Sequence, residues 1–189
     1  MASDVDLYDT HYAHLAAIAQ TDVRRETYDE DLGQSSWITL AEAREWFRLL
    51  RLDADSRVLE VGCGSGGITR RLAAETGASA VGVDINPHGI EAATASALRE
   101  GLSSRVSFQV VDAAQRLPFA VLQELHDVTG AEASVSARWR DARARRRDAL
   151  AAIEGEEGFE GLQRFLDAVC TLSRERRLSR FAYLAYKRA

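Results

Sequence analysis

The stretch LEVGCGSGG, residues 59–67, decides the fold because it joins a buried strand to a helix through a turn of glycines. The apolar run Arg57–Val61 predicts the strand, and Gly67–Thr76 predicts the helix. Such a turn needs positive φ angles and brings the backbone close to a ligand, and only glycine allows both at low cost. The free N–H groups of the following helix also point at the turn. The stretch therefore predicts a ligand-binding loop.

Strands and helices alternate outward from this loop. Before it, Trp37–Leu50 is expected to be an amphipathic helix with Thr39 as its N-cap. After it, the pattern predicts a strand over Ser79–Asp84, a helix over Gly89–Glu100 and a third strand over Arg105–Val111. This spacing is typical of βαβ units with parallel strands. The predicted fold class is α/β, a Rossmann-like sheet with helices on both faces.

Acidic side chains stand at the ends of all three predicted strands, namely Glu60, Asp84 and Asp112. In an open α/β sheet, ligands bind at this edge. The glycines also fit the G-x-G-x-x-G pattern, and Asp84 stands where a ribose-binding carboxylate belongs, so an NAD-dependent oxidoreductase is one alternative. Glu60 favours another ligand, because a carboxylate beside the loop attracts an amino group and gains nothing from a pyrophosphate.

Three motifs, VLEVGCGSGG, VGVDIN and FQVVDA, together resemble the class I S-adenosylmethionine-dependent methyltransferases of small-molecule type. The resemblance implies that the glycine loop holds the methionine part of the cofactor. It also implies that Asp84 binds the ribose hydroxyls, that Asp112 contacts the adenine amino group and that Glu60 orients the loop. Cys63 is expected to serve packing there, although a thiol in such a loop also suggests a nucleophile. The implied cofactor-binding residues are Glu60, Gly62, Cys63, Gly64, Gly66, Asp84, Ile85, Asp112 and Ala113.

The segment before the core, YDEDLGQSSW over residues 28–37, resembles the part of these enzymes that closes over the cofactor. This resemblance implies further cofactor contacts from Gln34, Ser35 and Trp37. Residues 1–50 are accordingly expected to form an N-terminal helical cap.

The chain departs from the family after Phe119. Residues 51–119 supply the βαβαβ half that binds the cofactor, but the family's fourth and fifth strands do not follow, so about two units of roughly 30 residues are missing. Residues 120–189 instead resemble the family's sixth and seventh strands with helices between them, including one long helix over Ser134–Ile153. These strands are expected to complete the sheet in the order 3-2-1-7-6, with an incomplete centre.

Composition agrees with an ordinary globular chain. Of 189 residues, 46% are hydrophobic and 28% charged, and no apolar run is long enough to span a membrane. The acidic N-terminus lacks a signal pattern, so a cytoplasmic location is expected. Two cysteines provide neither a disulfide framework nor a metal cluster.

Basic residues gather late in the chain. Residues 138–189 carry 13 basic and 8 acidic side chains, against 11 and 21 in residues 1–137. Six arginines between residues 138 and 147 are read as a solvated helix face, with Asp141 and Arg145 as an i,i+4 pair. A nucleic-acid surface is the less favoured alternative, since only Trp139 interleaves the arginines.

The predicted function is S-adenosylmethionine-dependent methyl transfer to a small-molecule acceptor. No catalytic side chain is assigned, because methyl transfer from a sulfonium relies on positioning. The first alternative is a catalytically silent relative that binds the cofactor and acts as a regulatory or dimerising subunit. An exposed sheet edge would favour a homodimer in that case.

Overall fold

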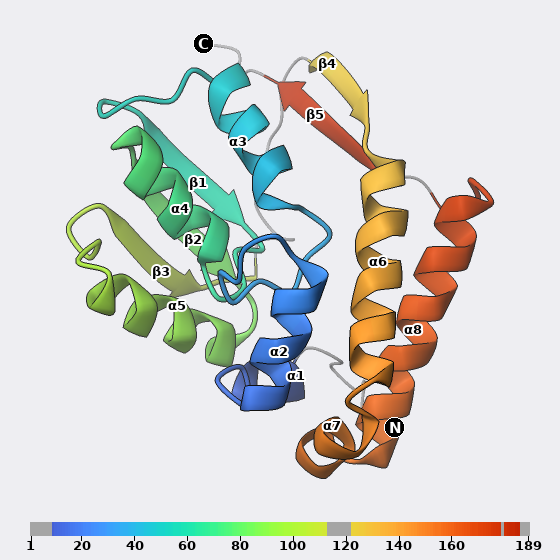
Figure 1. The fold of residues 1–189 in the computed structure, drawn as a ribbon. Helices are drawn as coiled ribbons and strands as arrows, with labels where there is room; N and C mark the ends of the chain where they lie inside the picture. The colour runs from blue at the N-terminus through green and yellow to red at the C-terminus, as the bar shows by residue number, and fades with distance from the viewer. Residues whose placement is uncertain (1–8, 113–121, 179, 186–189) are drawn as a thin grey trace.

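The computed structural model describes residues 9–112, 122–178 and 180–185 (Figure 1). None of the helices in these ranges has the length and apolar character needed to cross a membrane. Along the chain the elements are α1 (Asp9–Ala13), α2 (Ile18–Thr27), α3 (Leu40–Leu49), β1 (Arg57–Val61), α4 (Gly67–Thr76), β2 (Ser79–Asp84), α5 (Pro87–Arg99), β3 (Val106–Val110), β4 (Leu122–Asp127), α6 (Thr129–Ala144), α7 (Arg147–Glu154), α8 (Glu156–Arg174) and β5 (Phe181–Ala185).

The first three strands form a parallel sheet in the order β1-β2-β3, as the alternating pattern predicts. The register pairs Glu60 with Gly82 and Gly82 with Phe108, so the carboxyl ends of the strands meet at one edge. Helix α5 begins earlier than expected, because the side chain of Asn86 accepts a hydrogen bond from the N–H of Gly89 and caps the helix. Pro87 fits the first helical turn, where no donor is needed.

Three helices cover one face of this sheet. Figure 1 shows α3, α4 and α5 on the same side, and α3 packs against α4. Thr39 caps α3 as predicted, accepting a hydrogen bond of 3.2 Å from the N–H of Glu42. The apolar core between helices and sheet consists of Ala43, Phe47, Leu72, Ala73, Ala78, Ala80, Ala97 and Val106.

Part of the opposite face of the sheet is left exposed by the described residues. Leu59 and Val61 alternate with the inward-facing residues of β1, and their side chains are 55% and 46% exposed. Helices were predicted on both faces of the sheet. Within the described ranges, they cover one face only.

The C-terminal strands do not join this sheet. β4 and β5 pair antiparallel with each other and form a separate two-stranded sheet in the part of the chain that the structure describes. The expected order 3-2-1-7-6 is therefore wrong for the described strands. Asp127, two residues before α6 begins, pairs with Phe181. The two strands therefore adjoin α6.

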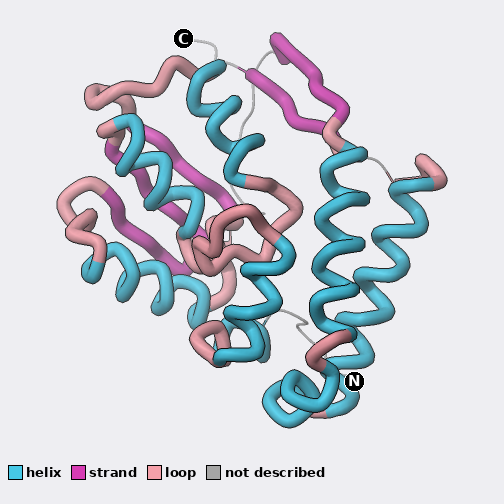
Figure 2. Tube along the Cα trace, in the orientation of Figure 1, coloured by secondary structure: helices cyan, strands magenta, loops and turns pink. Residues whose placement is uncertain are grey.

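The long helix predicted over Ser134–Ile153 is two helices. α6 begins at Thr129, whose N–H donates to the carboxylate of Asp127 at 3.0 Å, and it ends at Arg145. Arg146 leaves helical geometry with φ −120° and ψ 25°, and α7 follows. α8 then returns beside α6 (Figure 2).

A second apolar core joins these helices to the N-terminal segment. It consists of Val23, Trp139, Ala142, Leu150, Phe159, Leu162 and Leu166, with Trp37 packed against it. Residues 9–50 thus contact both cores, because α2 packs on α6 and α3 packs on α4. The division of the chain at residues 50 and 119 stays a prediction.

Candidate functional site

The glycine loop, residues 62–67, turns the chain sharply from β1 into α4. Gly62, Gly64 and Gly66 have φ angles of +73°, +53° and +69°, which L side chains rarely adopt. The N–H groups of Gly62 and Cys63 both donate to the carbonyl of Val83, at 2.8 and 3.1 Å. These bonds fasten the loop to β2 and fix its shape without a ligand.

The space around the glycines shows which side of the loop is open. A Cβ on Gly66 would lie 2.5 Å from the ring of Phe108, and one on Gly64 would lie 2.2 Å from the hydroxyl of Tyr12. A Cβ on Gly62 would meet no atom of the described residues within 4 Å. The loop is therefore packed on two sides and open at Gly62, where a ligand can approach the backbone.

The acid at the end of β2 belongs to the loop geometrically. One carboxylate oxygen of Asp84 accepts a hydrogen bond from the N–H of Gly64 at 2.8 Å, and the other accepts from the N–H of Asn86 at 2.8 Å. Asp112 lies just beyond β3 and is exposed. The structure thus brings the predicted acids to one edge of the sheet, where their negative charges favour a cationic ligand.

Glu60 is the half-buried acid of the site. Its carboxylate accepts a hydrogen bond from the hydroxyl of Thr69, on the first turns of α4. Burial raises the pKa of Glu60 to about 7, and the nearby charge of Asp84 adds to this, while the Thr69 hydroxyl opposes it. Glu60 therefore exchanges its proton near neutral pH.

Cys63 is a packing residue in this arrangement. Its Sγ would lie 2.8 Å from a Cβ on Gly82, so the thiol fills the space against β2. Burial, followed by the charges of Glu60 and Asp84, raises the pKa of Cys63 to about 12. The thiol stays protonated at neutral pH, which is the opposite of what a nucleophile needs.

Gln34 and Trp37, which the resemblance predicts to contact the cofactor, contact other parts of the N-terminal segment and the helices, respectively. Gln34 is 5% exposed, and its amide bonds the N–H of Leu32 and the carbonyl of Glu30. The ring of Trp37 lies 5.7 Å from Trp139, between centroids, in the second core. The cofactor contacts that the resemblance implies for these two side chains stay a prediction.

Three further residues are predicted to belong to the site. Ile85 follows Asp84 and is 66% exposed at the end of β2. The hydroxyl oxygen of Ser35 is buried in the N-terminal segment without a hydrogen-bond partner. Ala113 lies outside the described residues.

Two residues of α4 that lie beside the glycine loop were not predicted from the sequence. Thr69 and Arg70 follow Gly66 by three and four residues, and both bond groups beside the glycine loop. This helical spacing from the last loop glycine is the signal that identifies them, because it places their side chains back over the turn.

A cavity of about 880 Å³ lies between the N-terminal segment and the outer sides of α4 and α5. Tyr12, Leu32 and Gly33 line one wall, while Gly67 and Arg70 belong to the other. It contains none of the strand-end acids. The N-terminal segment therefore lies against the rear of the glycine loop and away from its open side.

The arginines of α6 and α7 are paired, and this disfavours a nucleic-acid surface. Arg145 contacts Glu26 of α2, so the predicted pairing with Asp141 is wrong. Arg143 and Glu154 form a buried pair at 2.7 Å with side chains 0% and 4% exposed. The other acids paired with arginines 138–147 are Asp22, Asp29, Asp141, Glu156, Glu160 and Asp167.

A parallel sheet, a glycine loop entering a helix and an acid at each strand end are features of α/β folds that bind a nucleotide-type cofactor. Residues 52–136 match the protein family described as a methyltransferase domain. The chain thus carries a class I methyltransferase domain over this stretch. Among the residues that the structure describes, no group of His, Cys, Asp and Glu is placed to hold a metal ion.

The curated relatives match less than half of this chain. Methyltransferase GfsG of Streptomyces halstedii is 40% identical over 91 residues, which is 46% of this chain and 32% of that protein. The probable chloroplastic tocopherol O-methyltransferase of Oryza sativa subsp. japonica is 47% identical over 62 residues, or 33% of this chain and 17% of that protein. The chain thus matches less than a third of the length of either relative.

The fold extends over nearly the whole chain. The cyclopropane synthase MmaA2 from Mycobacterium tuberculosis aligns with a TM-score of 0.71 at 13% identity, covering 94% of this chain and 97% of that one. At this identity the likeness is one of fold, and the reaction must be argued from the site.

Proposed function

We propose that this chain is an S-adenosylmethionine-dependent methyltransferase acting on a small-molecule acceptor. The observation that carries the proposal is the glycine loop, open at Gly62 and bonded through Gly64 to the strand-end carboxylate of Asp84. The family match over residues 52–136 supports the same reading.

The residues present fit this cofactor. S-adenosylmethionine, when bound, supplies a sulfonium methyl group for transfer to an acceptor nucleophile. The open backbone at Gly62 gives the ligand close approach, and the carboxylate of Asp84 favours its cationic groups. Asp84 keeps lone pairs for hydroxyl donors, since each of its oxygens accepts one backbone bond. These residues bind and orient, and positioning can supply much of the rate.

The acceptor is proposed to be a small molecule. The names of two relatives support this, since one is a probable tocopherol O-methyltransferase and another is a sterol 24-C-methyltransferase. A nucleic-acid acceptor lacks support, because the arginines of α6 and α7 are paired with acids.

Calorimetric titration with S-adenosylhomocysteine tests the proposal. We expect binding to the native chain and at least a tenfold loss in Asp84→Asn, which removes the charge of a group placed at the open edge. Asp53→Asn is the matched control, because Asp53 makes the same type of bond to the N–H two residues on, in a loop at the far ends of the strands. Absence of heat from a folded native sample would overturn the proposal.

A second candidate is a relative that binds the cofactor without transferring a methyl group. The exposed part of the sheet face at Leu59 and Val61 favours it, since a second copy of the chain would cover these side chains. Binding of S-adenosylhomocysteine without methylation of any phenol, amine or sterol acceptor, together with a dimer in sedimentation, supports this candidate. An NAD-dependent enzyme predicts enhanced NADH fluorescence on mixing, and we expect none.

A further inference from the structure

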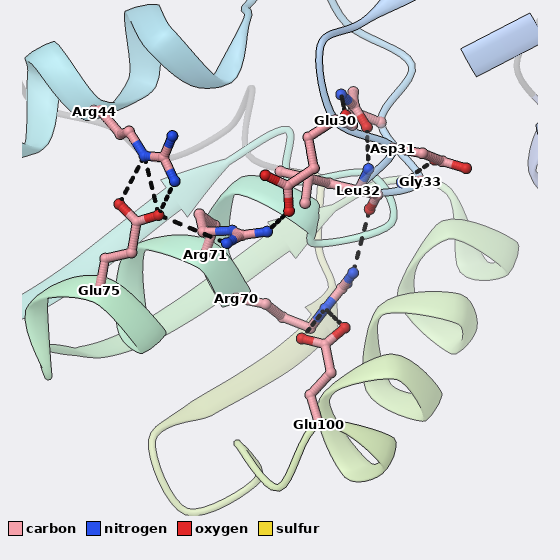
Figure 3. Close-up of polar contacts among 10 residues, drawn as sticks. Glu30, Asp31, Leu32, Gly33, Arg44, Arg70, Arg71, Glu75 and Glu100 are labelled. Carbon is pink, nitrogen blue, oxygen red and sulfur yellow. Dashed lines mark hydrogen bonds and ion pairs between the residues drawn. The ribbon is translucent and has the colours of Figure 1, made fainter. Parts of the chain in front are cut away.

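The guanidinium of Arg70 joins three separate parts of the chain around the glycine loop (Figure 3). Arg70 is 6% exposed, and its Nη1 donates to the carbonyl of Ser65 at 2.6 Å. Its Nη2 donates to the carbonyl of Leu32 at 3.2 Å, and its Nε donates to the carboxylate of Glu100 at 3.1 Å. One side chain therefore connects the loop, the N-terminal segment and the end of α5.

The part of the N-terminal segment that Arg70 reaches, residues 30–34, is called the lid segment here. Its own bonds make it a compact turn, since the Gln34 amide accepts from the N–H of Leu32 and donates to the carbonyl of Glu30. Gly33 has a φ of +77°, and its N–H donates to the carboxylate of Asp31. These bonds make the lid segment one compact unit, which Asp31 also ties to Arg24 of α2 at 2.7 Å.

Further contacts press this unit against the glycine loop. The hydroxyl of Ser65 donates to the carbonyl of Gly33 at 2.6 Å, and Arg71 pairs with Glu30. The approach is close, because a Cβ on Gly67 would lie 2.6 Å from the carbonyl oxygen of Leu32. The glycine loop and the lid segment thus hold each other in place through direct backbone contacts.

We propose that Arg70 is a positioning residue that holds the lid segment on the glycine loop and thereby sets cofactor affinity. The proposal rests on the proposed function for its second half. When a ligand binds only the ordered loop, part of the binding free energy is spent on ordering that loop. Contacts that order the loop before binding therefore increase affinity. The planar guanidinium of Arg70 donates to three partners that lie in different directions. A lysine ammonium is a compact group and cannot reach all three partners at once.

The experiment compares Arg70→Lys with two controls. Glu100→Gln removes the ion pair but keeps both bonds from Arg70 to carbonyls, and Arg48→Lys changes an exposed, doubly bonded arginine whose partner is Glu45. Hydrogen exchange of the lid segment is measured in the ligand-free chain, and affinity for S-adenosylhomocysteine by calorimetry. We expect Arg70→Lys to speed lid exchange and weaken binding about tenfold each, and both controls to stay within about threefold of the native chain.

Ser65→Ala provides a second route if Arg70→Lys does not fold, since it removes the bond to Gly33 from the other side. It should increase lid exchange about threefold. Native exchange and affinity in Arg70→Lys, or a lower melting temperature alone, overturn the proposal. If the native chain does not bind S-adenosylhomocysteine, the proposed function fails, while lid exchange still decides whether Arg70 holds the segment.

Discussion

Replacing Glu60 with glutamine should change how stability depends on pH. Burial raises the pKa of this carboxyl from 4.5 to about 7 in the folded chain. At about 1.4 kcal/mol per pH unit, its ionisation costs up to about 3 kcal/mol more in the folded than in the unfolded chain. Between these pKa values the folded chain holds more protons, so the free energy of unfolding falls as pH rises. Glu60→Gln removes this fall, because glutamine does not titrate.

Urea denaturation followed by the fluorescence of the three tryptophans measures the effect. The difference in unfolding free energy between Glu60→Gln and the native chain should rise by about 3 kcal/mol from about pH 4 to about pH 8. Thr69→Val is a companion variant of similar volume, which removes the hydroxyl that donates to Glu60. It should extend the native fall to higher pH. An equal difference at both pH values would refute the assignment of a half-buried, titrating Glu60.

The other predictions concern stability measured by the same urea method. Gly66→Ala should cost about 2–4 kcal/mol, because it adds strain at positive φ to a collision with the ring of Phe108. Gly62→Ala meets no neighbour among the described residues and should cost only about 1–2 kcal/mol, and equal losses would contradict the packing of the loop. Arg143→Met should cost about 3–5 kcal/mol, since it leaves the carboxylate of Glu154 buried without its partner. The double variant with Glu154→Leu should recover most of that loss, and a single-variant cost below about 1 kcal/mol would speak against a buried pair.

The local sequence pattern was sufficient to predict the strands and helices of the cofactor-binding half. The bounds of β1, α4 and β2 agree with the spacing of apolar residues and glycines. The start of α5 was missed by two residues, because the cap formed by Asn86 was not recognised. The break at Arg146 was also missed, since the surrounding sequence is uniformly helix-forming and the break depends on how α7 packs.

The N-terminal segment shows what a local motif leaves undetermined. Gln34 and Trp37 match a pattern that implies cofactor contacts, yet one closes its own turn and the other enters the second core. Both outcomes depend on partners distant in sequence, such as Trp139, which a local motif does not specify. The role of Arg70 was hidden for the same reason, because two of its three partners are 30 and 38 residues away.

The sequence by itself determined the order of strand, glycine loop and helix and the placement of an acid at each strand end. These features follow from backbone rules that act over a few residues: positive φ at glycine, period-two burial and parallel strand ends. Only the tertiary structure decided that the last two strands form their own sheet, that the described residues leave part of one face of the main sheet exposed, and that the lid segment rests on Arg70. Those outcomes depend on which distant surfaces bury one another, and many pairings of apolar faces satisfy the same local pattern.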